Sequence, residues 1–201
     1  MQSLLTDLET VLQSQTPPLT ATFADPATED AIREAEDKLD ATFPEDLRAF
    51  LLCANGQRTE DGIYPVGNFV VPRIRFAPGG WGLSAWGHFL GLEQIVEHTL
   101  YHYELDEYEN DDEGREFIGP VAAHYRHIII SAADDPVSIG LDLRPAKGGQ
   151  IGQVVTINDQ PDYTACLAPS LSAFLRLLID GYRAGRFKRE EDGTLTETDN
   201  A

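Results

Sequence analysis

Hydrophobic residues in the first 60 positions recur every three or four residues, the spacing of one face of an α-helix. This pattern predicts three amphipathic helices. The first covers residues 3–14, the second starts after Thr28, whose hydroxyl can cap a helix, and the third starts at Pro44 and stops at Asn55-Gly56. The residues expected to face the core are Leu4, Leu5, Leu8, Val11, Leu12, Ile32, Ala35, Leu39, Leu47, Phe50, Leu51 and Ala54.

The pattern changes after residue 60. Residues 62–76 are rich in β-branched and aromatic side chains but are interrupted by prolines, which predicts short or edge strands. A helix is expected from residue 91 to about 108, and the apolar run 128–130 is typical of a central strand covered on both faces. Residues 137–143 alternate with a period of two, which predicts a half-buried strand with Asp142 on the face opposite its apolar residues.

The order of these elements predicts an α+β fold in which N-terminal, middle and C-terminal helices flank a mixed, mainly antiparallel sheet. The strand at 154–157 is expected to pair antiparallel with the preceding one, and Ser170 is expected to cap the closing helix. We expect a single domain over residues 1–188 with its core at about 26–182. Residues 189–201 contain little that could pack, so a disordered acidic tail is predicted there.

Charge narrows the range of partners. The chain has 15 Lys and Arg against 34 Asp and Glu, a formal net charge of −19. The electrostatic field of so negative a chain repels nucleic acid and anionic lipid and favours a basic protein partner. Simple solubility is the other interpretation of this charge, and charge alone favours it. There is no signal-like N-terminus or membrane-length apolar run, and Cys53 and Cys166 lie within apolar patterns, as expected for buried thiols. These features favour a cytoplasmic location.

Several strings along residues 26–182 resemble the SUKH superfamily of bacterial immunity proteins and fungal cell-wall assembly regulators. The strings that carry the resemblance are Thr28-Glu29-Asp30-Ala31-Ile32, Phe43-Pro44-Glu45-Asp46-Leu47, Asn55-Gly56, Phe89-Leu90-Gly91-Leu92-Glu93-Gln94-Ile95, Ile128-Ile129-Ile130-Ser131, Ile139-Gly140-Leu141-Asp142, Gly152-Gln153-Val154 and Ser172-Ala173-Phe174-Leu175. The resemblance implies a mixed sheet flanked by helices and a function in protein binding without catalysis. Its bacterial members are thought to neutralise toxins, often nucleases, and its fungal members act as scaffolds.

We therefore predict a non-enzymatic protein-binding module, an immunity protein that binds a basic toxin domain. The alternative is a cytoplasmic scaffold or regulatory protein related to the cell-wall regulators. No functional residue transfers by motif within this family, so the binding surface is inferred from residue types. Acidic and tyrosine side chains concentrate between 101 and 116, where the tyrosines could supply contact area and the carboxylates could steer a basic partner.

The predicted contact residues combine this segment with two tryptophans in a glycine-rich setting, each of which could be an exposed anchor or a core residue. They are Tyr101, Tyr103, Glu104, Asp106, Glu107, Tyr108, Glu109, Asp111, Asp112, Glu113, Trp81 and Trp86. A flexible acidic loop is the other reading of residues 104–116.

Catalytic and metal sites are weakly indicated. His98 and His102 are four residues apart, the spacing of helical zinc ligands, but no glutamate adjoins the first and no third ligand is evident. His124 and His127 could pair with Asp134 or Asp135, yet there is no nucleophile motif. We expect ordinary surface or loop histidines, a structural or solvated Asp142, and no catalytic residue, metal or cofactor.

Overall fold

Five helices frame the part of the chain that the computed structural model describes, namely residues 1–60, 64–75, 84–106, 127–132, 137–145, 148–158, 165–189 and 195–198. The helices are α1 (Gln2–Gln13), α2 (Glu29–Leu39), α3 (Glu45–Leu51), α4 (Leu92–Asp106) and α5 (Leu171–Arg183). All five correspond to helices predicted from the hydrophobic spacing.

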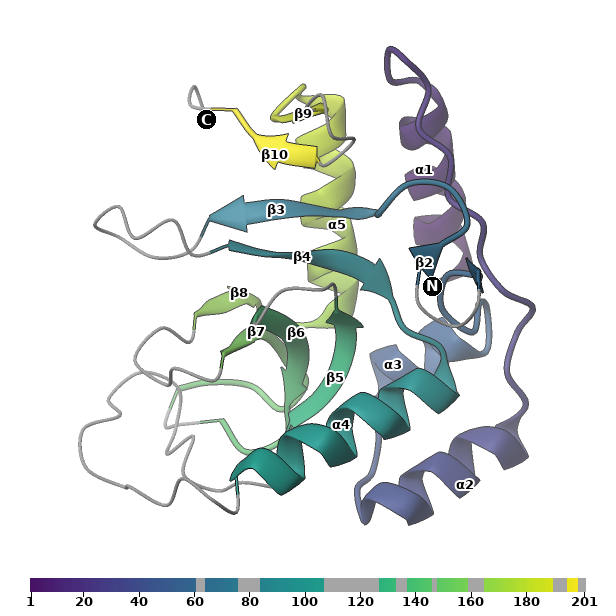
Figure 1. The fold of residues 1–201 in the computed structure, drawn as a ribbon, viewed down its shortest axis with the longest axis vertical. Helices are drawn as coiled ribbons and strands as arrows, with labels where there is room; N and C mark the ends of the chain where they lie inside the picture. Colours follow the sequence, from purple (N-terminus) through teal and green to yellow (C-terminus); the bar gives the residue numbers. More distant parts are fainter. Residues whose placement is uncertain are drawn as a thin grey trace.

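An eight-stranded sheet forms the centre of the molecule (Figure 1). Its strands run in the order β8-β7-β6-β5-β4-β3-β10-β9, and every neighbouring pair is antiparallel except β10 with β3, which are parallel. Their bounds are β3 (Val71–Arg75), β4 (Ser84–Phe89), β5 (His127–Ala132), β6 (Val137–Asp142), β7 (Gln153–Asn158), β8 (Cys166–Ala168), β9 (Phe187–Arg189) and β10 (Leu195–Glu197). Two short strands, β1 (Thr59–Glu60) and β2 (Tyr64–Pro65), form a separate ribbon. The predicted α+β class and mixed, mainly antiparallel sheet are confirmed.

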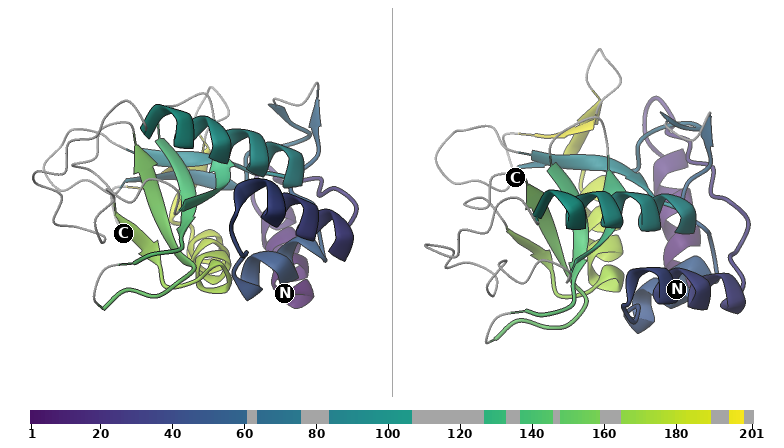
Figure 2. Two further views of the ribbon diagram at one scale, coloured as in Figure 1. Left: turned by 90° about the horizontal axis from the view of Figure 1, so that it is seen from below. Right: turned by 60° about the horizontal axis from the view of Figure 1, so that its bottom comes forward.

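Helices cover both faces of the sheet. Figure 2 shows α4 over one face and α5 over the other. On one side α4 packs against β5 and has α2 alongside it, while on the other α5 packs against β7 and β8 and has α1 alongside it. None of the helices in the described ranges has the length and apolar composition that a bilayer crossing requires.

Local capping explains why two of the helices start where they do. The Thr28 hydroxyl accepts a hydrogen bond of 3.2 Å from the amide of Ala31, and the Ser170 hydroxyl accepts one of 3.2 Å from the amide of Ala173. Each cap satisfies an amide that the first helical turn leaves without a partner, so both caps expected from the sequence are confirmed.

Strand β6 corrects one prediction. Its alternating pattern predicts a half-buried strand, but all six residues are buried, including Ser138 and Asp142. The strand lies between β5 and β7 in the sheet, with Ser138 beside His102 of α4 and Asp142 hydrogen-bonded to Gln153 of β7. Alternation reports side-chain polarity, and here the polar side chains find partners inside the protein.

Several strands, among them β4 and β10, come from segments where none was expected. Strand β4 contains Gly87 and has no β-branched residue, yet it lies between β3 and β5 in the middle of the sheet. Strand β10 falls within residues 189–201, the predicted disordered tail, and its Leu195 is only 4% exposed. Pairing with β3 and β9 supplies the backbone hydrogen bonds, so this part of the predicted tail belongs to the sheet.

Candidate partner-binding surface

Three hydrogen bonds set the position and rotation of α4 on the sheet. The amide of Leu92 donates to the Asn55 side-chain oxygen at 2.8 Å, and the Thr99 hydroxyl accepts from the amide of Ile129 at 3.1 Å. One turn further on, the Tyr103 hydroxyl donates to the carbonyl of His127 at 3.1 Å. Because these contacts lie along the buried stripe of the helix, they determine which residues are turned outward.

The outward stripe of α4 combines carboxylates with large apolar side chains. Glu93 and Glu97 are exposed, and they are followed by Leu100 and Tyr101, which are 39% and 57% exposed. Exposed aromatic and aliphatic side chains next to charges are typical of a protein-binding patch. Tyr101 is the predicted contact residue that the structure places most clearly at the surface.

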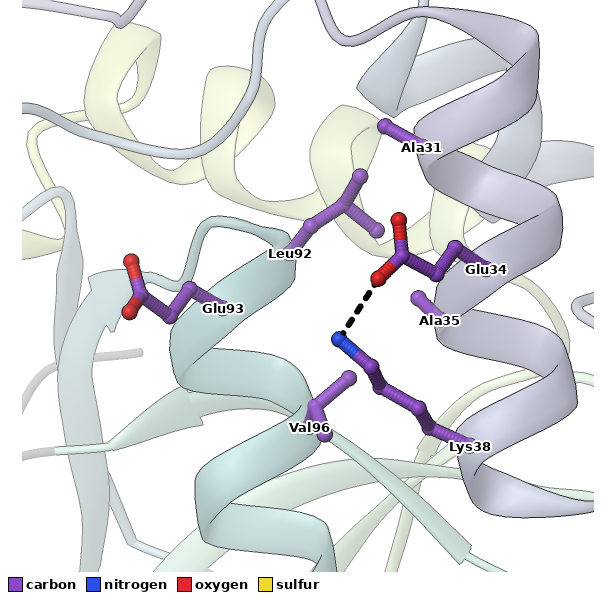
Figure 3. Close-up of a pocket in the computed structure, with 7 residues that line it drawn as sticks. All are labelled: Ala31, Glu34, Ala35, Lys38, Leu92, Glu93 and Val96. Carbon is purple, nitrogen blue, oxygen red and sulfur yellow. Dashed lines mark ion pairs between the residues drawn. The ribbon is translucent and has the colours of Figure 1, made fainter.

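A shallow groove of about 280 Å³ lies between α2 and α4 (Figure 3). Its apolar lining consists of Ala31, Ala35, Leu92 and Val96. The charged residues along it are Glu34, Lys38 and Glu93. In Figure 3 the ion pair between Glu34 and Lys38, at 2.9 Å, runs along the α2 side of the groove, and Glu93 points away from α2. The small alanines leave room between the two helices.

Negative charge dominates both helices around this groove. The two cations of α2 are each paired within the helix, Arg33 with Asp30 at 2.8 Å and Lys38 with Glu34. We use the name α2–α4 surface for the groove lining together with the exposed side chains beside it. Those side chains are Asp30, Glu34, Asp37, Glu93, Glu97, Leu100 and Tyr101.

Tyr103 has to be removed from the predicted contact set. Its side chain is only 8% exposed, and its hydroxyl bonds to the backbone of β5. The helical period explains the difference between the two tyrosines, because positions two apart point in very different directions around the helix. Glu104 and Asp106 belong to the last turn of α4, and the predicted residues from Glu107 to Glu113 lie outside the described part of the chain.

The two predicted tryptophans have different outcomes. Trp81 lies outside the described residues. Trp86 in β4 is half-buried, with its ring edge-on to Phe69 at 4.9 Å between centroids and with the Arg73 guanidinium 5.3 Å from its centre. The Trp86 ring is therefore neither fully buried in the core nor fully exposed as an anchor for a partner.

The histidines of α4 correct another expectation. His98 and His102 are half-buried rather than ordinary surface residues, because the helix packs on the sheet along this side. The His102 Nε2 atom lies 3.4 Å from the Ser138 hydroxyl, and burial lowers the pKa of His98. His88 of β4 is only 4% exposed, and burial, with the nearby His98 imidazole, lowers its pKa to about 4.

These groups do not assemble into a metal site in the described ranges, where no three His, Cys, Asp or Glu side chains are placed to hold an ion. His124, Asp134 and Asp135 fall outside those ranges. Cys53 is half-buried, but Cys166 is exposed at the start of the edge strand β8, which corrects the expectation that both thiols are buried.

Asp142 has a structural position. Its carboxylate accepts hydrogen bonds from the amide of Arg144 at 2.8 Å and from the Gln153 side chain at 3.0 Å. Its side chain is 1% exposed, so it can contact no partner. Of the two readings left open by the sequence, the structural one is confirmed.

The residues that sequence reasoning missed are the groove lining and the carboxylates of α2. The sequence does indicate part of this surface. The outward face of α2 is charged, and Ala31 and Ala35 are four residues apart, which places two small residues on one face of the helix. The approach of α2 to α4 depends on packing between segments about 60 residues apart. No local pattern encodes that approach.

A family model described as "SMI1 / KNR4 family (SUKH-1)" matches residues 26–177, more than half of the chain. The matched range begins before α2, ends within α5 and includes both helices of the α2–α4 surface. No curated protein matches the chain.

Proposed function

Since this chain belongs to the SMI1/KNR4 family (SUKH-1), whose non-enzymatic domains are of the immunity-protein or cell-wall-regulator type, we propose that it neutralises a toxin by binding it. The toxin is a basic protein domain, with nucleases as the leading class. Binding takes place in the cytoplasm and blocks the toxin without any bond being made or broken. The chain itself contacts neither nucleic acid nor membrane.

The observation that carries this proposal is the composition of the α2–α4 surface. An apolar groove is bordered by carboxylates and continues into Leu100 and Tyr101. Interfaces commonly combine an apolar centre, which supplies affinity when water is excluded, with a charged rim. The geometry thus suits a partner that inserts an apolar side chain flanked by lysines or arginines.

Electrostatics supports a basic partner for this surface. Opposite charges that meet across an interface raise the association rate, and the effect weakens as salt screens the charges over about 8 Å at physiological ionic strength. The formal charge of −19 gives this protein a field that attracts a basic domain from many directions. The exposed carboxylates of α2 and α4 would guide that domain to the groove.

The proposal predicts that a gene beside this one encodes the toxin domain, and the test expresses that domain with and without this chain in bacteria. The wild-type chain is expected to restore growth and to bind the purified domain with an affinity that falls as salt rises. The variant Glu93→Gln/Glu97→Gln keeps the shape of α4 and removes two charges. Its association rate should fall about tenfold and its salt dependence should become shallower.

A charge-matched control separates local contact from the overall field. Asp7→Asn/Glu9→Gln removes two exposed charges from α1, which packs beside α5 on the opposite side of the sheet. This control is expected to bind within about twofold of the wild type. Equal effects of the two variants would exclude the α2–α4 surface as the contact site. A failure to restore growth, with no binding, would instead point to the scaffold function.

A further inference from the structure

A second hollow is lined by the chain leaving α1 and by residues of β9 and β10. Figure 1 shows β9 and β10 at the opposite end of the molecule from α2 and α4. It has a volume of about 320 Å³, near the lower end of the range for small-molecule sites. Its apolar lining includes three buried side chains, Leu19, Phe187 and Leu195. The charged residues that line it are Lys188 and Arg189.

The apolar floor is held firmly. The Phe187 ring packs edge-on against Tyr182 at 4.9 Å, and the Tyr182 hydroxyl donates to the carbonyl of Val70 at 2.8 Å. Gly181 is required for this arrangement, because a Cβ at that position would lie 2.3 Å from the Phe187 ring. The backbone pairing of Leu195 with Arg189 joins the two strands of the corner. The hollow is therefore preformed.

Its charge is opposite to that of the whole molecule. Residues 176–189 hold five of the 15 cations of the chain and a single acidic residue, Asp180. Arg183 lies 3.8 Å from Asp180, and the Arg186 guanidinium covers the Phe187 ring at 5.8 Å. Within the described ranges Arg189 has no ion-pair partner and is exposed at the rim.

Glu197 of β10 pairs with Phe187 and so belongs to the same corner, but it is not among the residues that line the hollow. Salt screens charges over about 8 Å, so an anion in the hollow interacts mainly with the cations that line it. Thr16 and Thr198 also line the hollow, and threonine hydroxyls can donate hydrogen bonds to anionic oxygens. A hollow with an apolar floor and cations at its rim suits a molecule that has an apolar body and one anionic end.

All ten residues that line the hollow lie outside residues 26–177. The hollow is therefore built by the segments that flank the family region, and it depends on β9 and β10. We propose that it binds a small organic anion, a carboxylate or phosphate carried on an apolar body. This site is independent of toxin binding at the α2–α4 surface.

The test follows backbone amide signals by NMR while the full-length protein is titrated with phenyl phosphate, benzoate or inorganic phosphate. Phenyl phosphate or benzoate should shift the signals of Phe187, Lys188 and Thr198 in a saturable way, and the tighter of the two identifies the anionic group. Inorganic phosphate should bind at least about fivefold more weakly, because it leaves the apolar floor in contact with water.

Lys188→Gln/Arg189→Gln should weaken binding about fivefold to tenfold, as expected for two exposed cations. The control Arg33→Gln/Lys38→Gln removes two cations from α2 and should leave binding unchanged. If Lys188→Gln/Arg189→Gln does not fold, the titrations of the wild-type protein with the three probes test the proposal by themselves. The proposal is overturned if no probe gives saturable shifts below about 10 mM. It is also overturned if inorganic phosphate binds as tightly as phenyl phosphate, or if both variants lose the same affinity.

Discussion

The side-chain oxygen of Asn55 accepts a hydrogen bond of 2.8 Å from the amide of Leu92, 37 residues further along the chain. Asn55 follows α3 and Leu92 is the first residue of α4, so the residue expected to stop one helix also caps the start of another. This contact joins the N-terminal helices to the helix that carries the proposed partner surface.

Replacing Asn55 with alanine is expected to lower the free energy of unfolding by about 1 kcal/mol, because the first turn of α4 loses a cap. Asn55→Asp keeps an acceptor at the same place and should cost less. Urea unfolding of the three proteins measures the difference. Equal losses in both variants would mean that the hydrogen bond is not the stabilising feature.

Gly56 should be much less tolerant of substitution than another glycine with the same backbone preference. It has φ +74°, and a Cβ would lie 2.4 Å from the backbone of Gly91 and Leu90. Gly148 also has a positive φ, +100°, but no atom of the described residues lies within 4 Å of its Cβ position. Gly56→Ala should therefore cost more than about 2 kcal/mol and Gly148→Ala about 1 kcal/mol. Similar melting temperatures for the two variants would contradict the close approach.

The buried pair Asp142 and Gln153 should show strong coupling. Asp142→Ala leaves the Gln153 amide and the Arg144 backbone amide without their acceptor, which is expected to cost about 2–3 kcal/mol. In a double-mutant cycle, Gln153→Ala in the Asp142→Ala background should cost less than it does in the wild type. Additive losses, measured by denaturant unfolding, would show that the pair does not interact.

His88 should make the protein less stable in mild acid. The pKa of His88 is about 4 in the folded protein and 6.5 ordinarily. Between these two pH values the unfolded chain binds a proton at His88 and the folded protein does not. The stability from neutral His88 is complete above pH 6.5 and is lost as pH falls towards 4, by about 3 kcal/mol. The group facing it from α4 is His98, whose pKa is also lowered by burial.

His88→Gln removes this titration while keeping a polar side chain. Unfolding free energies measured between pH 7.5 and pH 4.5 should fall more steeply in the wild type than in this variant. Parallel pH profiles would assign the acid sensitivity to other groups.

Substitutions at Tyr101 and Tyr103 should affect different properties, partner binding at Tyr101 and stability at Tyr103. Tyr101→Ala is expected to weaken binding of the neighbouring-gene toxin domain about tenfold and to change stability by less than about 0.5 kcal/mol. Tyr103→Phe removes the hydroxyl that bonds to His127 and should cost about 1 kcal/mol of stability with unchanged affinity. Calorimetry and unfolding curves measure the two effects, and the opposite pattern would refute the orientation of α4.

Much of the helical framework could be predicted from the chain alone. Thr28, Ser170 and the apolar spacing of α1, α2 and α5 act over a few residues, so the expected caps and buried faces are confirmed. The central strand β5 is also confirmed, because a continuous apolar run requires cover on both faces. The family resemblance drew on the same local strings and is confirmed over residues 26–177.

The remaining features depend on contacts between distant segments. Strand β4 pairs with β3 and β5, and β10 pairs with β3 and β9. The buried carboxylate of Asp142 accepts a hydrogen bond from the side chain of Gln153. The groove that gives the α2–α4 surface its shape arises only where two helices meet. Local periodicity decides which side of an element is apolar. Only the folded arrangement decides which neighbour covers it, because that choice depends on the packing of the whole chain.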